Sequence, residues 1–176
     1  MAICVITKPA FANLVQNPGF ETGDLTDWTL GGDTTYVSVS TGAPHTGTYS
    51  LVMGNISDGT LDQSIATVVG QSYIVDFWLA AGFGADDNLS ASFGGTNAIS
   101  LMNYMGDYMH FTSAPIVATS TSTDLNFTYA NPDGQFFLDD ISVNGVSGVP
   151  ETLSTLWLAL PFAGMIALRQ LRRRIA

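Results

Sequence analysis

Short runs of β-forming residues, each closed by turn residues, constrain the fold of this chain more than any other feature. The runs are rich in Val, Ile, Phe, Tyr and Thr, and Gly, Asn, Asp and Pro separate them. They cover residues 36–40, 49–53, 72–80, 89–93, 124–129 and 136–143. No segment before the C-terminal tail has a sustained helical period. Many short strands with frequent turns predict an all-β, two-sheet antiparallel sandwich.

Alternation within the run 72–80 predicts which of its side chains face away from the core. Tyr73, Val75, Phe77 and Leu79 share one face, and Ile74, Asp76 and Trp78 share the other. The more apolar face is expected to point inward, which leaves Asp76 and Trp78 on the outside of the sandwich.

The last run, 136–143, places a carboxylate among apolar residues. Simple alternation puts Asp139 on one face with Phe137, Ile141 and Val143. A buried carboxylate needs a partner. Because residues 13–149 contain no Lys or Arg, that partner must be a backbone amide, a hydroxyl group or a cation.

The charge of the chain is divided between two stretches. The formal net charge is −10, all fifteen carboxylates lie between Glu21 and Glu151, and four of the five basic residues follow residue 168. Nucleic acid and anionic membrane surfaces are therefore not expected as partners of residues 13–149, since binding to phosphate relies on cations. This stretch also lacks Cys, so its stability cannot come from disulfides.

These patterns divide the chain into five parts. Residues 1–12 end in a small-x-small cleavage pattern and are expected to be the remnant of a truncated signal peptide, which includes Cys4. Residues 13–145 have the size of one domain. A linker of small residues follows and runs into a Val-Pro-Glu motif at 146–152, then an apolar run at 153–168 and a basic tail at 169–176.

The apolar run is a candidate for a short transmembrane helix. Its sixteen residues would span about 24 Å as a helix, against about 30 Å of hydrocarbon. The arginines after it, Arg169, Arg172, Arg173 and Arg174, are expected on the cytoplasmic side. A buried core helix is the alternative, but the run is apolar on every face.

The motif Val149, Pro150 and Glu151, followed by the apolar run and the arginines, resembles the PEP-CTERM sorting signal of Gram-negative bacteria that make exopolysaccharide. The chain departs from that pattern at Thr152, where the family has a second proline. The resemblance implies that an exosortase in the inner membrane removes the tail and delivers the domain to the cell surface or extracellular matrix. A permanent single-pass anchor is the alternative.

Residues 13–145 resemble carbohydrate-binding modules of the galactose-binding-like jelly-roll class. Six segments carry the likeness in order: 17–21 (NPGFE), 27–28 (DW), 45–51 (HTGTYSL), 61–65 (LDQSI), 70–78 (GQSYIVDFW) and 137–143 (FLDDISV). The resemblance implies a jelly roll with a structural calcium ion bound by Glu21, Asp139 and the main chain near Thr46 and Tyr49. The alternative for Asp139 is a turn cap made by backbone N–H groups.

If the domain binds glycan, the outward face of the run 72–80 is the predicted site. Asp76 and Trp78 lie on it, and neighbouring strands are expected to add His110 and Asn126, together with Thr112 and Thr128. Phe83, Tyr104 and Tyr108 are further candidates, expected on loops. The alternative for Trp78 is packing inside the sandwich.

Catalysis is not expected. Asp139 and Asp140 are adjacent on a predicted strand, so alternation points them to opposite faces and prevents them from acting as paired glycosidase carboxylates. No Gly-x-Ser-x-Gly elbow is present. The sequence thus favours an exported surface or matrix protein whose domain binds polysaccharide, such as exopolysaccharide. A structural matrix protein or adhesin without a sugar site and a small secreted hydrolase are the alternatives.

Overall fold

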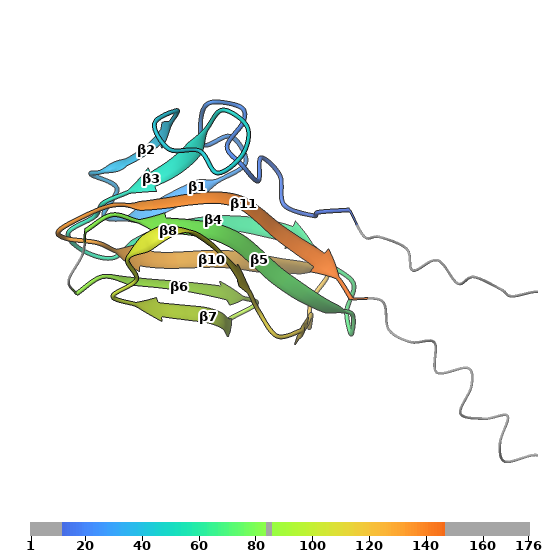
Figure 1. Cartoon of the computed structure of the whole chain (residues 1–176). Helices are drawn as coiled ribbons and strands as arrows, with labels where there is room; N and C mark the ends of the chain where they lie inside the picture. The colour runs from blue at the N-terminus through green and yellow to red at the C-terminus, as the bar shows by residue number, and fades with distance from the viewer. Residues whose placement is uncertain (1–11, 84–85, 147–176) are drawn as a thin grey trace, which may run out of the picture.

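The computed structural model describes residues 12–83 and 86–146, which form eleven strands in two antiparallel sheets packed face to face (Figure 1). Sheet A has the order β1 (Thr29–Gly32), β4 (Gly59–Ala66), β10 (Ser122–Ala130), β6 (Asn88–Phe93) and β7 (Thr96–Met102). Sheet B has the order β2 (Val37–Ser40), β3 (Ser50–Met53), β11 (Phe136–Gly145), β5 (Ser72–Ala81) and β8 (Gly106–Thr112), and β9 (Ile116–Val117) also pairs with β5. The predicted all-β sandwich is confirmed.

The predictions for the tail and the leader fall outside the described residues. These include the sorting motif Val149 to Glu151, the apolar run and the terminal arginines. Within the described part of the chain, no helix is long and apolar enough to cross a membrane.

The core lies between the two sheets and is rich in aromatic rings. In β5 the side chains of Tyr73, Val75, Phe77 and Leu79 are buried, as alternation predicts, and the intervening ones are half-buried. Phe77 meets Phe127 of sheet A edge-on, with ring centroids 5.3 Å apart. Because these inward side chains come from the central strands of both sheets, they hold the two layers together.

A β-bulge in β11 overturns the simple alternation predicted for that strand. The register with β5 shifts between Asp139 and Ser142, and Asp140 adopts a left-handed backbone with φ of 48°. Phe136 and Leu138 before the bulge are buried, as are Ile141 and Val143 after it, whereas Phe137 is half-buried. The prediction that Phe137 and Asp139 share the inner face with Ile141 and Val143 was therefore wrong.

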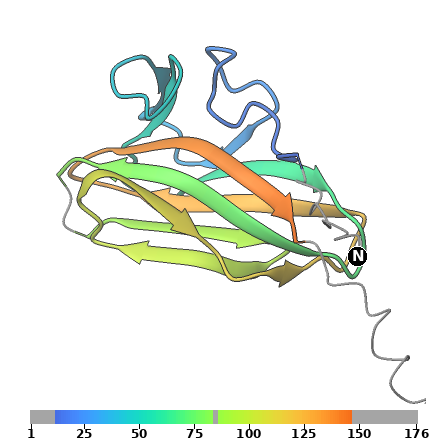
Figure 2. The same ribbon diagram turned by 45° about the vertical axis from the view of Figure 1, so that its right-hand side comes forward.

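The two ends of the described chain are tied together. The Asn13 side chain donates to the carbonyl of Ile141 (2.8 Å) and accepts from the amide of Val143 (3.0 Å). The amide of Leu14 also donates to the carbonyl of Val143 (3.1 Å). The early segments in blue and cyan gather beside β11 in Figures 1 and 2.

We expect Phe77→Ala to lower the free energy of unfolding by about 3–5 kcal/mol, because it opens a cavity where three aromatic rings meet. Phe77 is completely buried against Phe111 and Phe127. Urea denaturation measures the change. The control Val117→Ala, at a side chain that is 55% exposed, should stay within about 0.5 kcal/mol. A small loss for Phe77→Ala would contradict this description of the core.

Candidate functional site

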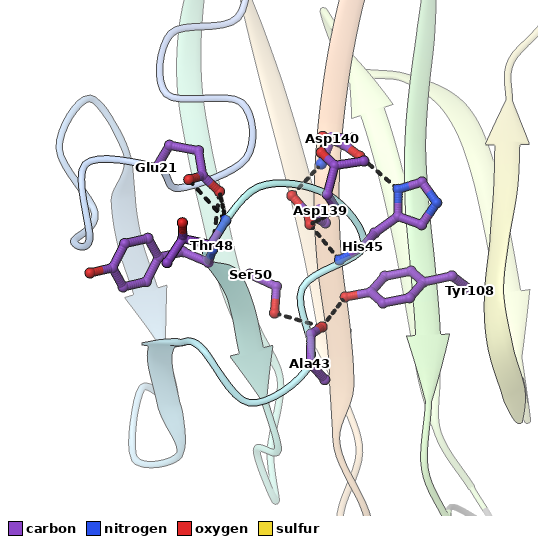
Figure 3. A network of polar contacts seen from close by, with 10 residues as sticks. Glu21, Ala43, His45, Thr48, Ser50, Tyr108, Asp139 and Asp140 are labelled. Carbon is purple, nitrogen blue, oxygen red and sulfur yellow. Dashed lines mark hydrogen bonds and ion pairs between the residues drawn. The ribbon is translucent and has the colours of Figure 1, made fainter.

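The loop 41–49, between β2 and β3, lies over the outer face of β11 and is held there by Asp139 (Figure 3). Asp139 is completely buried. Its Oδ2 accepts from the amides of His45 (2.8 Å) and Thr46 (3.2 Å), and its Oδ1 accepts from the amide of Asp140 (2.7 Å). Burial raises the pKa of Asp139 and outweighs these amide bonds, which act to lower it.

Asp140 faces the same loop as Asp139. Its Oδ2 lies 2.6 Å from Nδ1 of His45, and its Oδ1 accepts from the Thr46 hydroxyl (2.7 Å). The prediction that Asp139 and Asp140 point to opposite faces was wrong. The reason is the left-handed backbone at Asp140, which turns its side chain back toward the loop.

Glu21 holds the second half of this loop. Its carboxylate accepts from the amides of Thr48 (3.0 and 3.1 Å) and Tyr49 (3.0 Å). Gly47 precedes these amides with a φ of 63°, and a Cβ there would overlap the carboxylate of Glu21. The turn therefore requires glycine at this position.

The structure brings together all four residues predicted to hold calcium. A Cβ on Gly19 would lie 3.0 Å from Oδ1 of Asp139 and 3.7 Å from Cγ of Glu21, so both side chains converge on this glycine. Thr46 and Tyr49 donate their amides to the same two carboxylates. Carboxylate oxygens are ligands that calcium prefers, but backbone N–H groups cap both carboxylates here, which is the alternative predicted for Asp139. The described residues hold no group of three or more His, Cys, Asp or Glu suited to a metal. Calcium binding stays a prediction.

Trp78 lies half-buried on the outer face of sheet B, not inside the sandwich. His45 stacks on its ring with centroids 3.9 Å apart and planes at 17°, and His110 stacks at 5.1 Å and 19°. His45 comes from the loop above β11, whereas His110 is the cross-strand partner of Trp78 on β8. Since β5 lies between β11 and β8, the indole stands between the two imidazoles, which are the only histidines in the chain.

Three of the four residues predicted to bind glycan lie together on this face. Oδ1 of Asp76 is 3.4 Å from Nε2 of His110, and Trp78 stacks on the same imidazole. Asn126 does not join them. It lies on β10 in sheet A, where its amide donates to Oδ1 of Asp62 (2.5 Å). The predicted placement of Asn126 was wrong because alternation predicts which face of a strand a residue is on, but not the sheet to which the strand belongs. The placement predicted for Thr128, also on β10, was wrong for the same reason.

A hollow of about 460 Å³ continues this face toward the ends of β5 and β8. Tyr108 and Phe137 line it, with Ala43 and Ala80 among the smaller residues. The Tyr108 hydroxyl donates to the carbonyl of Ala43 (2.7 Å), which also accepts from Ser50 (3.0 Å) (Figure 3). Tyr108 lies on a strand, not on the loop predicted for it. The role of Phe137 was missed because alternation without the bulge turned it inward.

Residues 12–137 match the protein family described as Carbohydrate binding domain. Among curated proteins, Endo-1,4-beta-xylanase A of Thermoanaerobacterium saccharolyticum is 26% identical over 148 residues, a match that covers 76% of this chain and 13% of the xylanase. The chain thus spans a small part of that enzyme, and the match falls on the part that resembles a carbohydrate-binding module, a non-catalytic type of domain.

Solved carbohydrate-binding modules have the same fold. TmCBM61, solved in complex with β-1,4-galactotriose, is similar with a TM-score of 0.64 and 23% identity, covering 75% of this chain and 97% of the other. The CBM22-1 xylan-binding domain of Xyn10C from Paenibacillus barcinonensis has a TM-score of 0.61 and 14% identity, covering 81% and 99%. The predicted jelly-roll fold of carbohydrate-binding modules is confirmed.

If calcium binds at Glu21 and Asp139, it should raise the melting temperature by several degrees over protein dialysed against a chelator. A ligand of the native state at a hundred times its Kd adds about 2.7 kcal/mol of stability. Magnesium at the same concentration is the control and should have less effect. The shift should shrink in Glu21→Gln. Equal melting temperatures with calcium and with chelator would rule the metal out.

Tyr108 should make stability sensitive to alkaline pH. Burial, reinforced by the charges of Asp139 and Asp140, raises the pKa of Tyr108 to about 12. Because the raised pKa favours the neutral phenol in the folded state, its stabilising contribution is complete below pH of about 10 and is lost as the pH rises toward 12. Urea denaturation between pH 9 and 11.5 measures this loss. Tyr108→Phe should reduce the slope without abolishing it, because burial also raises the pKa of Tyr129 to about 12. An unchanged slope would contradict the assignment.

Proposed function

The chain belongs to the family of carbohydrate binding domains, and from this premise we propose that the outer face of sheet B binds a neutral polysaccharide. The binding groove is defined here as the surface from His110 and Trp78 to the hollow beside Tyr108 and Phe137. The observation that carries the proposal is the gathering of half-buried aromatic rings and the exposed imidazole of His110 on the outer face of sheet B, beside this hollow.

The rings of the groove suit the apolar faces of pyranose units. Glycan and other small-ligand sites are mostly apolar and aromatic, with a few placed polar groups that fix orientation. Tyr108 and Phe137 supply rings at the hollow, and the small side chain of Ala80 leaves room beside them for a sugar to approach. Both faces of Trp78 carry imidazoles, so Trp78 acts mainly by holding His110 in place, and the half-exposed His110 contacts the ligand.

Polar groups along the groove can bind sugar hydroxyls. Asp76 lies beside His110, and Asp107 lines the hollow. A carboxylate accepts hydrogen bonds from hydroxyl groups, and such charge-assisted bonds are stronger than neutral ones. Asp76 and Asp107 therefore place a hydrogen-bond acceptor at each end of the groove.

The charge of the groove selects against acidic polysaccharides. Asp76, Asp107 and Asp140 lie in or beside it, and the described residues include no Lys or Arg to offset them. A uronic acid unit would bring a carboxylate against these charges without a partner. Neutral glycans such as β-1,4-galactotriose and xylan, the ligands named for two structural neighbours, are therefore the first candidates.

We expect isothermal titration calorimetry to show binding of β-1,4-galactan or xylan, and much weaker binding of polygalacturonate. His110→Ala should weaken binding at least about tenfold, a loss of about 1.4 kcal/mol. Ser64→Ala is the matched control, because Ser64 is exposed on the outer face of sheet A, where it bonds Ser122. Equal affinities of His110→Ala and the control, in folded protein, would contradict the proposed groove.

The second part of the proposal concerns where the domain acts. The motif Val149, Pro150 and Glu151, with the apolar run and arginines after it, supports export and sorting by an exosortase to the surface or matrix of an exopolysaccharide-producing bacterium. There the domain would bind exopolysaccharide. Mass spectrometry of the mature C-terminus tests the sorting step: an end near Glu151 is expected, and an intact Ala176 would instead support a permanent anchor.

A further inference from the structure

Three loops converge at the end of the sandwich where β11 begins. They are the connection that ends in Tyr36, the segment 54–58 after β3 and the hairpin 131–135 between β10 and β11. Together they line an open hollow of about 380 Å³, here called the end hollow. Its lining includes Tyr36, Gly54, Ile56 and Gln135, and it shares no lining residue with the hollow beside Tyr108.

Close backbone packing around Gly54 gives the end hollow its shape. The Gly54 amide donates to the carbonyl of Tyr36 (3.2 Å). A Cβ on Gly54 would lie 2.9 Å from the carbonyl oxygen of Gly134 and 3.2 Å from Cγ of Gln135. A further bond, from the amide of Asn131 to the carbonyl of Asn55 (2.9 Å), joins the two loops beneath. The hollow is therefore held by the main chain and is preformed.

Large apolar side chains stand exposed at the rim of this hollow. Tyr36 is 54% exposed and Ile56 is 63% exposed. Asp133 and Gln135 add a carboxylate and an amide at the same place. An exposed aromatic ring, an aliphatic neighbour and a few hydrogen-bonding groups around a concave surface form the combination that small polar ligands with one apolar face require.

We propose that the end hollow is a second carbohydrate-binding site, which takes one or two pyranose units of a neutral glycan stacked on Tyr36. The class of ligand rests on the function proposed above, whereas the place rests on the hollow itself. Asp133 and the absence of Lys and Arg from the described residues exclude acidic sugars here as they do in the binding groove. Gln135 and Asp133 bind the ring hydroxyls.

Two sites would let one domain contact two glycan chains. Because the two hollows share no residue, each can be filled while the other is occupied. Two weak sites acting together on a polymer increase the overall affinity well beyond that of either site. On soluble polysaccharide the same arrangement cross-links chains.

Calorimetry with two short neutral oligosaccharides, β-1,4-galactotriose and a xylose oligomer, tests this proposal. The wild type should bind two oligosaccharides per domain, His110→Ala and Tyr36→Ala should each bind one, and the double variant should bind none. Val69→Ala, at a side chain that is 58% exposed on the loop between β4 and β5, is the control and should keep two. Melting curves establish that each variant is folded.

The outcomes separate the two proposals. One oligosaccharide per wild-type domain, with binding lost in His110→Ala and unchanged in Tyr36→Ala, would overturn the end hollow and leave the binding groove intact. Binding lost in Tyr36→Ala and unchanged in His110→Ala would support the end hollow and overturn the groove. A wild type that binds no glycan overturns both.

Discussion

The buried carboxylate of Asp139 is the group on which the arrangement of the proposed binding groove depends. No Lys or Arg among the described residues can neutralise it, so backbone amides stabilise it, and two of the three belong to the loop 41–49. The loop is fixed over β11 in return. His45 then reaches Trp78, and the carbonyl of Ala43 reaches Tyr108. The cost of burying this acidic group is thus offset by hydrogen bonds from backbone amides, and the same bonds order the loop.

The bulge after Asp139 allows β11 to hold the loop 41–49 and still contribute to a continuous core. An extra residue in β11 lets Asp139 and Asp140 both contact the loop while Ile141 and Val143 return to the interior. Without the bulge, alternation would have placed one of the two carboxylates between the sheets, where only hydrocarbon surrounds it. A local departure from strand geometry therefore places two charges on one face.

The sequence predicted the sandwich, the faces of β5 and the need of Asp139 for a partner, because these follow from period-two alternation and charge composition. It did not predict the bulge, since a left-handed backbone at Asp140 has no glycine to signal it. Asn126 was misplaced because the pairing of distant strands decides the sheet. The convergence of His45 and His110 on Trp78 depends on the same long-range topology. Alternation along a single strand therefore could not predict it.

The tie between Asn13 and the end of β11 has a mechanical consequence. Residue 146 leaves at that end, whereas the end hollow lies at the start of the ten-residue β11, about 30 Å away. A pull between residue 146 and a ligand held at the far loops acts along β11. Hydrogen bonds to β3 and β5 are perpendicular to the strand, so such tension loads them together in shear and does not peel them one at a time. If the end hollow binds a polymer, as proposed, β11 would carry the tension in that polymer.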